Sequence, residues 1–292
     1  MLREAVPADA VALEAFLARH AASSMFLRGN LEAHGTQERQ HRRGTTYLIK
    51  EDAGAICAVA GCTNAGYLMC QAPDQDAAFW EEVCWSLEGR SVAGITGVPD
   101  QTAAWAKALG AGAEDYSLND IEPLYQLDLA DVAAVDPDLS LRLPLADDLA
   151  MLTRWYDGFH RDTGITPGSG MTNEGVARDF IDNPDGRVLV AGGQPVAMTK
   201  LNARAVDSVQ IGGVYVPPDQ RGHGYGGAVV ALHLAALARQ DVQQAVLFAA
   251  NAYAAQAYER IGFCRVGEYR VALFKEPVIV GAARVGTSSK ER

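Results

Sequence analysis

Apolar positions along the first half of the chain follow two different spacings. At residues 8–33, Val11, Leu13, Phe16 and Leu17 recur at mixed three- and four-residue spacings, which predicts a helix. Elsewhere, short apolar runs bounded by turns such as Asp-Ala-Gly and Asn-Ala-Gly predict strands. The first half thus has predicted strands at 46–50, 55–62, 67–71 and 91–97 and predicted helices at 76–88 and 101–109. Strands mixed with helices in this order indicate an α/β or α+β domain.

A second block of the same kind begins after a polar break near residues 129–140. The break carries several aspartates and a proline between two apolar runs, which is typical of a domain boundary. It predicts an N-terminal domain at 1–135 and a C-terminal domain at 136–280, followed by a flexible tail at 281–292. The second block has predicted strands at 141–143, 187–191, 195–204, 208–216, 244–249 and 268–275 and predicted helices at 146–160, 172–181, 224–239 and 252–261. The similar plan of the two blocks suggests an ancient duplication.

The composition is that of a globular protein, with 49% hydrophobic and 21% charged residues. No stretch is apolar for long enough to predict a membrane span, and the start of the chain lacks the basic and apolar regions of a signal peptide. The net charge of −11 argues against nucleic acid as a partner, because phosphate backbones are bound mainly by Lys and Arg. The five cysteines and six histidines are scattered, which predicts reduced thiols in a cytoplasmic protein and no metal site.

The most informative run of the sequence lies between Val216 and Gly227. An apolar strand ends at Val216, two prolines stop its ladder, and a helix begins within the glycines. The glycines let several backbone N–H groups point one way, the helix adds the positive end of its dipole, and Arg221 adds a full charge. A pyrophosphate requires this chemistry. A glycine-rich junction without a ligand is the competing interpretation. A Rossmann turn is disfavoured, because prolines intervene and no acid ends the next strand.

The same residues resemble a known signature. Arg221-Gly222-His223-Gly224-Tyr225-Gly226 resembles the R-x-x-G-x-G/A acyl-CoA motif of the GNAT N-acetyltransferase superfamily. The later run LFAANAYAAQAYERIGFCRVGEYRVALF is similar to the family's second signature, with Asn251, Tyr258 and Gly262-Phe263 at the matching places. The resemblance covers roughly residues 139–276. It is closest to a bacterial subgroup of predicted acetyltransferases that carry an extra N-terminal half.

The resemblance implies tandem GNAT-like domains of the α/β (α+β) class, each a mixed, mostly antiparallel sheet flanked by helices. It implies that the strand before the turn splays from its neighbour and pairs with the pantetheine arm, with a β-bulge at Gly212-Gly213. Tyr258 would be the general acid that protonates the departing CoA thiolate, and Asn251 would contact the cofactor arm or cap the next helix. The implied acetyl-CoA site comprises Val214, Tyr215, Val216, Arg221, Gly222, His223, Gly224, Tyr225, Gly226, Gly227 and Asn251.

The general base is the gap in this pattern. Many family members carry a Glu on or beside the strand that ends at Val216, but the matching positions here are Gln210, Gly212 and Val214, none of which is a base. The substitutes that the sequence offers are Asp207, His160, Asp162 and Glu174.

The expected function is therefore transfer of an acetyl group from acetyl-CoA to a primary amine of an unidentified small molecule or peptide, by direct attack. The missing Glu keeps a non-catalytic acyl-CoA-binding or regulatory module as the alternative. A tandem-fold transferase that uses aminoacyl-tRNA would need a basic groove, which the net charge of −11 disfavours. The N-terminal half has acids where a pyrophosphate would bind, so we expect it to shape the acceptor pocket or an interface and not to catalyse. The oligomeric state stays open, with a homodimer as one option.

Overall fold

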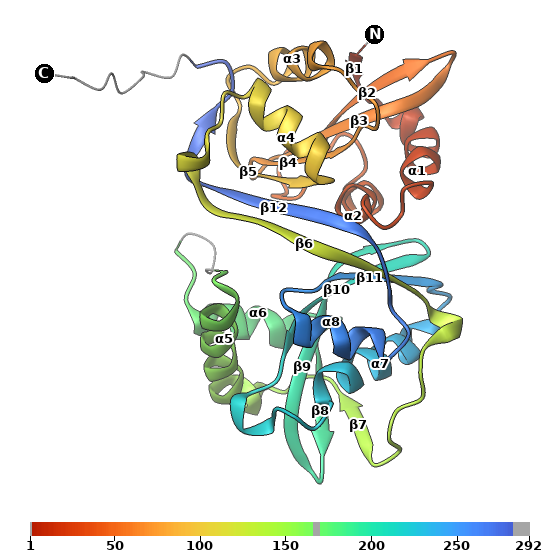
Figure 1. Ribbon diagram of the computed structural model, residues 1–292, viewed down its shortest axis with the longest axis vertical. Coiled ribbons are helices and arrows are strands. Elements are labelled where there is room, and N and C mark those ends of the chain that lie inside the picture. The colour runs from red at the N-terminus through yellow and green to blue at the C-terminus, as the bar shows by residue number, and fades with distance from the viewer. Residues whose placement is uncertain (1, 166–169, 283–292) are drawn as a thin grey trace, which may run out of the picture. The chain divides into compact units, whose positions relative to one another are not determined.

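The chain forms two compact units, each with segments from both halves of the sequence. The computed structural model describes residues 2–165 and 170–282 of the 292-residue chain (Figure 1). Unit 1 comprises residues 1–20, 33–121 and 270–292, and unit 2 comprises residues 21–32 and 122–269. No helix in the described ranges is long and apolar enough to cross a membrane.

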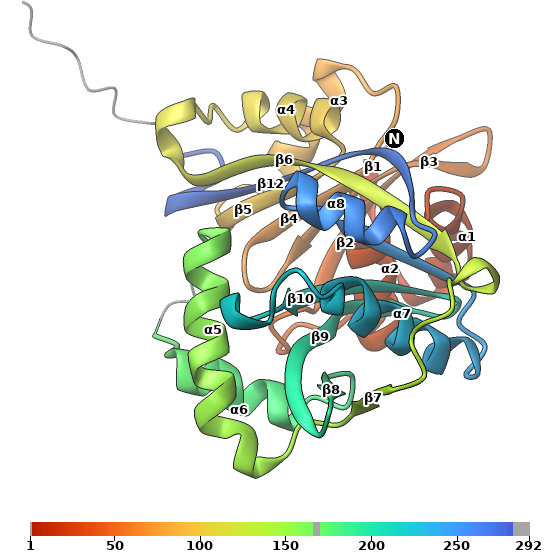
Figure 2. The same cartoon turned by 60° about the horizontal axis from the view of Figure 1, so that its bottom comes forward.

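Unit 1 is a mixed sheet with helices packed on it. Its elements are β1 (Leu2–Glu4), α1 (Ala10–Ala18), β2 (Thr45–Asp52), β3 (Ala55–Thr63), β4 (Tyr67–Gln71), α3 (Ala77–Ser86), β5 (Ser91–Gly97), α4 (Pro99–Ala108), the start of β6 (Tyr116–Asp128) and the end of β12 (Cys264–Ile279). The strands lie in the order β1-β2-β3-β4-β5-β12, and only the pair β4–β5 is parallel. Helices α3 and α4 lie side by side in both views (Figures 1 and 2).

Unit 2 repeats this plan. Its elements are most of α2 (Met25–His34), the rest of β6, β7 (Leu139–Arg142), α5 (Leu149–Thr163), α6 (Asn173–Asp182), β8 (Arg187–Ala191), β9 (Gln194–Ala205), β10 (Ser208–Tyr215), α7 (Tyr225–Ala238), β11 (Gln244–Phe248), α8 (Ala252–Glu259) and the start of β12. The strands lie in the order β6-β11-β10-β9-β8-β7, and only the pair β10–β11 is parallel. The expected α/β class with mostly antiparallel sheets is therefore confirmed.

The last strand of each half is exchanged between the units. β6 follows α4 in the chain, yet it pairs with β11 from Asp128↔Gln244 to Leu124↔Phe248. β12 follows α8, yet it pairs with β5 from Arg270↔Gly97 onward. Neither half of the sequence completes its own sheet. The two compact units are therefore made of segments that cross the boundary expected at residues 135 and 136. That boundary was expected from the polar break in the sequence, which carries no information on strand exchange.

Two hydrophobic cores cover the two faces of the sheet in unit 2. The first lies beneath α7, a helix that is apolar nearly all round, and it includes Val229, Val230 and Leu234. The second includes Trp155 and Tyr156 of α5 together with buried residues of α6 and of the strands. Helices α5 and α6 pack side by side in both views (Figures 1 and 2). Strands β9 and β10 are therefore held from both faces.

Most predicted elements of the sequence are present, with three differences. The single helix predicted at 8–33 is two helices, α1 and α2, separated by the turns at residues 19–24. The long strand β6 has no predicted counterpart, and β12 is longer than the strand predicted at 268–275. Of the tail expected at 281–292, residues 283–292 lie outside the described residues.

Candidate active site

Strands β10 and β11 form a fork in unit 2. Their parallel ladder runs only from Ser208↔Gln244 to Gln210↔Val246. β10 then continues to Tyr215 and β11 to Phe248, with no further pair recorded between these described strands. On its other side β10 stays paired with β9 as far as Tyr215↔Met198. The edge of β10 that faces the fork is therefore an unpaired strand edge, to which an extended ligand can add like a further strand.

A bulge at Gly212 and Gly213 lies at the mouth of this fork. The register between β10 and β9 shifts between Gly212 and Tyr215, and Gly213 has a φ of +58°. A Cβ on Gly212 would lie 2.0 Å from the side-chain amide nitrogen of Asn202, so the Asn202 amide lies directly over the backbone there. Both positions thus require glycine, one for a neighbour's close approach and one for its backbone conformation.

The three residues that follow the bulge point to alternate faces of the sheet. Val214 and Val216 pack against the core beneath α7. Tyr215 points to the other face, where its hydroxyl lies so close to Gly158 of α5 that a Cβ on Gly158 would be 2.0 Å from it. The side chains of this segment are therefore occupied in packing, and its backbone edge is what remains for a ligand.

The turn after β10 presents open backbone N–H groups. Gly222 and Gly224 have φ values of +84° and +77°, and Gly224 is the N-cap of the 14-residue helix α7. No hydrogen bond from the N–H groups of residues 222–227 to an acceptor in the described part of the chain is recorded. The first N–H groups of a helix have no partner within it and carry partial positive charge. Such an arrangement fits the oxygens of a pyrophosphate.

Arg221 lies beside the turn but is held toward α5. Its guanidinium donates to a carboxylate oxygen of Asp162 at 2.5 Å and to the carbonyl oxygen of Val216 at 3.1 Å. Both side chains of the ion pair are close to half exposed, at 49% and 43%. An exposed pair contributes little free energy, so a phosphate could replace Asp162 as the partner at small cost.

The other residues of the turn have distinct surroundings. His223 is exposed and its ring stacks on Tyr225, with ring centroids 5.4 Å apart. This placement fits the expectation of a solvent-facing turn residue. Gly227 lies against α8, since a Cβ there would be 3.1 Å from the carbonyl oxygen of Ala257. The turn is thereby fixed between β10 and α8.

Asn251 and Tyr258 are placed by α8. The Asn251 side chain accepts a hydrogen bond from the N–H of Ala254 at 2.9 Å and so caps the helix. Tyr258 is 7% exposed and belongs to the core beneath α7. Burial raises the pKa of Tyr258 above its ordinary value, and the negative charge of Glu122 adds to the increase. Its phenol therefore stays protonated at neutral pH, as a general acid must.

A segment of the N-terminal half contacts β10 and β11. Helix α2 belongs to unit 2, where Phe26 forms an aromatic group with Phe248 and Tyr269. Arg28 of the same helix is 1% exposed on its side chain and donates to Asp207 at 2.8 Å. The sequence pattern assigned α2 to a long helix of the first domain. Nothing in the sequence pattern indicated that Arg28 would be buried and would connect α2 to β10.

The four substitutes proposed for the base all have other partners. Asp207 pairs with Arg28 and Asp162 with Arg221. Glu174 pairs with Arg178 at 2.6 Å, and His160 lies 2.7 Å from Asn173 through a ring nitrogen. The structure does not bring these four groups together at the fork. Gln210, at the last pair of the ladder, is buried, and neither atom of its amide has a hydrogen-bond partner in the described residues.

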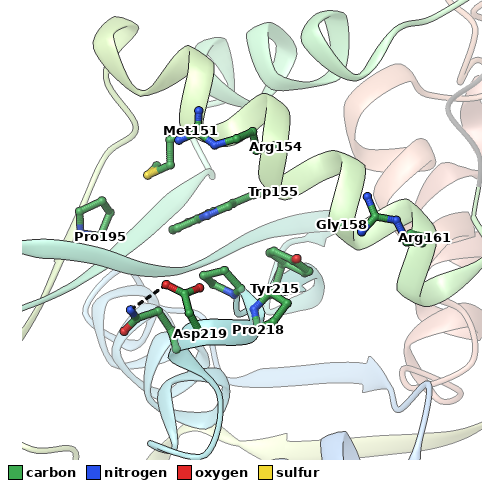
Figure 3. Close-up of a pocket in the computed structure, with 11 residues that line it drawn as sticks. Met151, Arg154, Trp155, Gly158, Arg161, Pro195, Tyr215, Pro218 and Asp219 are labelled. Carbon is green, nitrogen blue, oxygen red and sulfur yellow. Dashed lines mark hydrogen bonds between the residues drawn. The ribbon is translucent and has the colours of Figure 1, made fainter.

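A cavity of about 380 Å³ adjoins the turn on the α5 side (Figure 3). Figure 3 shows Arg154, Trp155 and Arg161 along α5 on one side of this cavity, and Tyr215 and Asp219 on the other side. Because Tyr215 points away from the core that contains Tyr258, this cavity lies on the other face of β10 from the phenol. It is therefore distinct from the fork.

The fork, the bulge and the open turn lie within a segment of the chain that matches a known family model. Residues 150–263 match the family model described as "Acetyltransferase (GNAT) family". They form a domain of that family, whose members transfer an acyl group from acyl-CoA to an acceptor. No curated protein matches the chain significantly in sequence.

Solved structures share the fold over nearly the whole chain. A Drosophila protein is 13% identical with a TM-score of 0.61, and the match covers 93% of this chain and 98% of that one. A GCN5-related N-acetyltransferase from Kribbella flavida is 17% identical with a TM-score of 0.56, covering 88% and 95%. A tandem GNAT protein from the clavulanic acid biosynthesis pathway is 14% identical with a TM-score of 0.51, covering 97% and 99%. The tandem GNAT-like fold expected from the sequence is thus confirmed.

Proposed function

We propose that this protein is an N-acetyltransferase that moves the acetyl group of acetyl-CoA to a primary amine by direct attack. The observation that carries the proposal is the fork between β10 and β11, which opens beside the turn at 222–227, whose N–H groups have no acceptor among the described residues. An extended pantetheine arm would pair with the backbone of Val214, Tyr215 and Val216, and its pyrophosphate would bind the turn from Arg221 to Gly227.

The chemical roles follow from the surroundings of each group. Backbone N–H groups at the fork would polarise the thioester carbonyl. Tyr258 would protonate the departing thiolate, since its buried phenol keeps its proton at neutral pH. Asn251 would hold the cofactor arm with the amide nitrogen that its capping bond leaves over. An amine suits the aromatic group of Phe26, Phe248 and Tyr269, because ring faces attract cations.

The test is release of CoA thiol by the full-length chain with acetyl-CoA and a panel of amines, namely spermidine, lysine, an aminoglycoside and a tripeptide. We expect turnover with at least one of them, and a loss of about 100-fold in Tyr258→Phe. Tyr253→Phe is the matched control, because Tyr253 lies on the same helix but is 87% exposed. Binding of acetyl-CoA without turnover, unaffected by Tyr258→Phe, would instead favour the non-catalytic acyl-CoA-binding module.

A further inference from the structure

The cavity beside α5 has no part in the proposed acyl transfer, because it lies on the other face of β10 from Tyr258. All of its lining residues belong to unit 2, and its volume is about 380 Å³ (Figure 3). Sites for small molecules in proteins usually measure about 300–1,000 Å³. At the lower end of this range, the cavity fits a ligand the size of a single amino acid.

Aromatic and proline side chains form the apolar part of the cavity. Trp155 of α5 and Tyr215 of β10 are both 7% exposed, and their ring centroids are 6.4 Å apart at an interplanar angle of 54°. The other apolar side chains include Pro195, Pro217 and Pro218. Buried rings and prolines have few alternative conformations, so this part of the cavity is formed before a ligand binds. Two tilted rings suit the packing of a further aromatic ring.

Each side of the cavity carries one charge without a counter-ion in the described residues. On α5, Arg161 forms an ion pair with Asp157, whereas neither an ion pair nor a hydrogen bond of the Arg154 guanidinium is recorded there. On the other side, the Asp219 carboxylate accepts a hydrogen bond from the neutral amide of Gln220 at 3.2 Å, the dashed line in Figure 3, and has no recorded cation. The cavity thus offers a positive charge from α5 and a negative charge from the turn after β10.

These two charges define the chemistry of the ligand. A guanidinium pairs with a carboxylate, and a carboxylate pairs with an ammonium group. A purely anionic ligand would leave Asp219 without a partner and beside a like charge, and a purely cationic ligand would do the same to Arg154. An amino acid carries both charged groups on one carbon atom, and its side chain can occupy the apolar part of the cavity.

We propose that this cavity binds a free amino acid with an aromatic side chain, at a second ligand site of unit 2 that is separate from the site of acetyl-CoA and its acceptor. The carboxylate of the ligand pairs with Arg154, its ammonium group pairs with Asp219, and its ring packs on Trp155 and Tyr215. The inference concerns binding alone and does not rest on the proposed function.

The test is isothermal titration of the full-length protein with L-phenylalanine and three analogues. We expect one equivalent of L-phenylalanine to bind with a Kd below about 1 mM. 2-Phenylethylamine lacks the carboxylate and 3-phenylpropionate lacks the ammonium group, so each should bind about 10-fold more weakly. Glycine retains both charges but has no ring, and it should also bind at least about 10-fold more weakly.

Two variants should give opposite patterns with these ligands. Arg154→Gln should weaken L-phenylalanine and 3-phenylpropionate by about 10-fold and leave 2-phenylethylamine within a few-fold of wild type. Asp219→Asn should weaken L-phenylalanine and 2-phenylethylamine and leave 3-phenylpropionate unchanged. Both side chains are exposed, so both variants should fold as the wild type does. Arg239→Gln is the control, because it removes an exposed positive charge at the end of α7, away from the cavity, and should change no ligand's Kd.

Two measurements establish whether the site is separate. Saturating acetyl-CoA should leave the Kd of L-phenylalanine within a few-fold, and displacement by acetyl-CoA would show that the cavity belongs to the cofactor. Thiol release with L-phenylalanine as acceptor should have the same kcat/KM in Arg154→Gln as in wild type. A loss of kcat/KM equal to the loss of binding would make the cavity the acceptor site. Displacement, or such a loss, would overturn this inference.

Two results of the titrations would also overturn it. One is no binding of L-phenylalanine at concentrations up to about 1 mM. The other is equal affinity of the wild type for L-phenylalanine and the two analogues that lack a charge, which would show that Arg154 and Asp219 do not recognise the ligand. Neither result bears on the fork, so the proposed function would stand. Absence of turnover with the amine panel would overturn the proposed function and leave this inference untouched.

Discussion

The junction between β4 and α3 in unit 1 and the junction between β10 and α7 in unit 2 occupy the same place in two similar sheets. Each follows the first strand of the parallel pair in its unit. In unit 1 the junction is closed by side chains, since Asp76 accepts a hydrogen bond from the N–H of Phe79 and Gln101 accepts one from the N–H of Ala72. In unit 2 the corresponding N–H groups at 222–227 have no recorded acceptor in the described residues.

The strands before these junctions differ as well. β4 ends two residues after its last parallel pair, Met69↔Thr96, whereas β10 continues from Gln210 to Tyr215 beyond its own. The same topology therefore closes the sheet in one unit and opens a fork in the other. A fold shared by two units thus does not imply a shared site, which depends on the residues at the turn and at the last pair of the ladder.

The largest effect, on acetyl-CoA binding, is expected when the turn at 222–227 in unit 2 is given an acidic side chain like those at the β4–α3 junction in unit 1. In Gly224→Asp, a carboxylate would stand where the pyrophosphate binds, and repulsion between these charges should weaken acetyl-CoA binding by about 100-fold or more. Gly224→Asn is the control, because Asn has the same shape and also tolerates the φ of +77°. Isothermal titration with acetyl-CoA measures both. Equal losses in the two variants would mean that backbone conformation, and not charge, governs the site.

The next effect, on stability at low pH, concerns α7. This helix buries a histidine, whereas α3 in unit 1 buries only the apolar residues Phe79, Trp80 and Val83. His233 is 0% exposed and neither ring nitrogen has a partner in the described residues. Burial, with the nearby charges of Arg187 and Arg204, lowers its pKa to about 3. The unfolded chain, with an ordinary histidine pKa of about 6.5, binds more protons below that pH, so acid destabilises the folded state.

From this difference we expect a loss of about 2 kcal/mol in the free energy of unfolding between pH 7 and pH 5 from His233 alone. The loss should begin near pH 6.5 and increase until the pH approaches 3. Urea unfolding of wild type and His233→Leu at both pH values measures it. The variant should lack this part of the acid sensitivity, and an identical pH dependence in the two proteins would refute the assignment.

The sequence predicted the local parts of this comparison and missed the long-range ones. Glycine positions and apolar periodicity placed α7 at 224–239, against Tyr225–Ala238 in the structure. β6 was missed because its middle carries Asn119, Asp120 and Pro123, residues that are rare in strands, and its partner β11 is far away in the sequence. The place of α2 depends on the buried Arg28, a residue type that a pattern assigns to the surface. Exchanged strands and buried ion pairs leave no periodic signal.

A smaller effect is expected at the last pair of each parallel ladder, which is Gln210 in unit 2 and the apolar Met69 in unit 1. A buried amide without partners costs about 1–3 kcal/mol, so Gln210→Met should raise the free energy of unfolding by about 1 kcal/mol. We also expect slower acyl transfer, because the amide at the start of the fork would be lost. Thermal unfolding and thiol release measure the two effects. A variant that is less stable than wild type would show that the Gln210 amide is satisfied in the folded protein.

The smallest effect tests the reverse change, which opens the closed turn of unit 1. Asp76→Ala removes the N-cap of α3 and should lower the free energy of unfolding by about 1 kcal/mol. It should not create a second acetyl-CoA site, because β4 lacks the long unpaired edge and Asp74 still places a negative charge in the turn. The binding stoichiometry from titration with acetyl-CoA should therefore equal that of the wild type. A second bound equivalent would mean that capping side chains alone separate the two junctions, and that the fork in unit 2 is not required for cofactor binding.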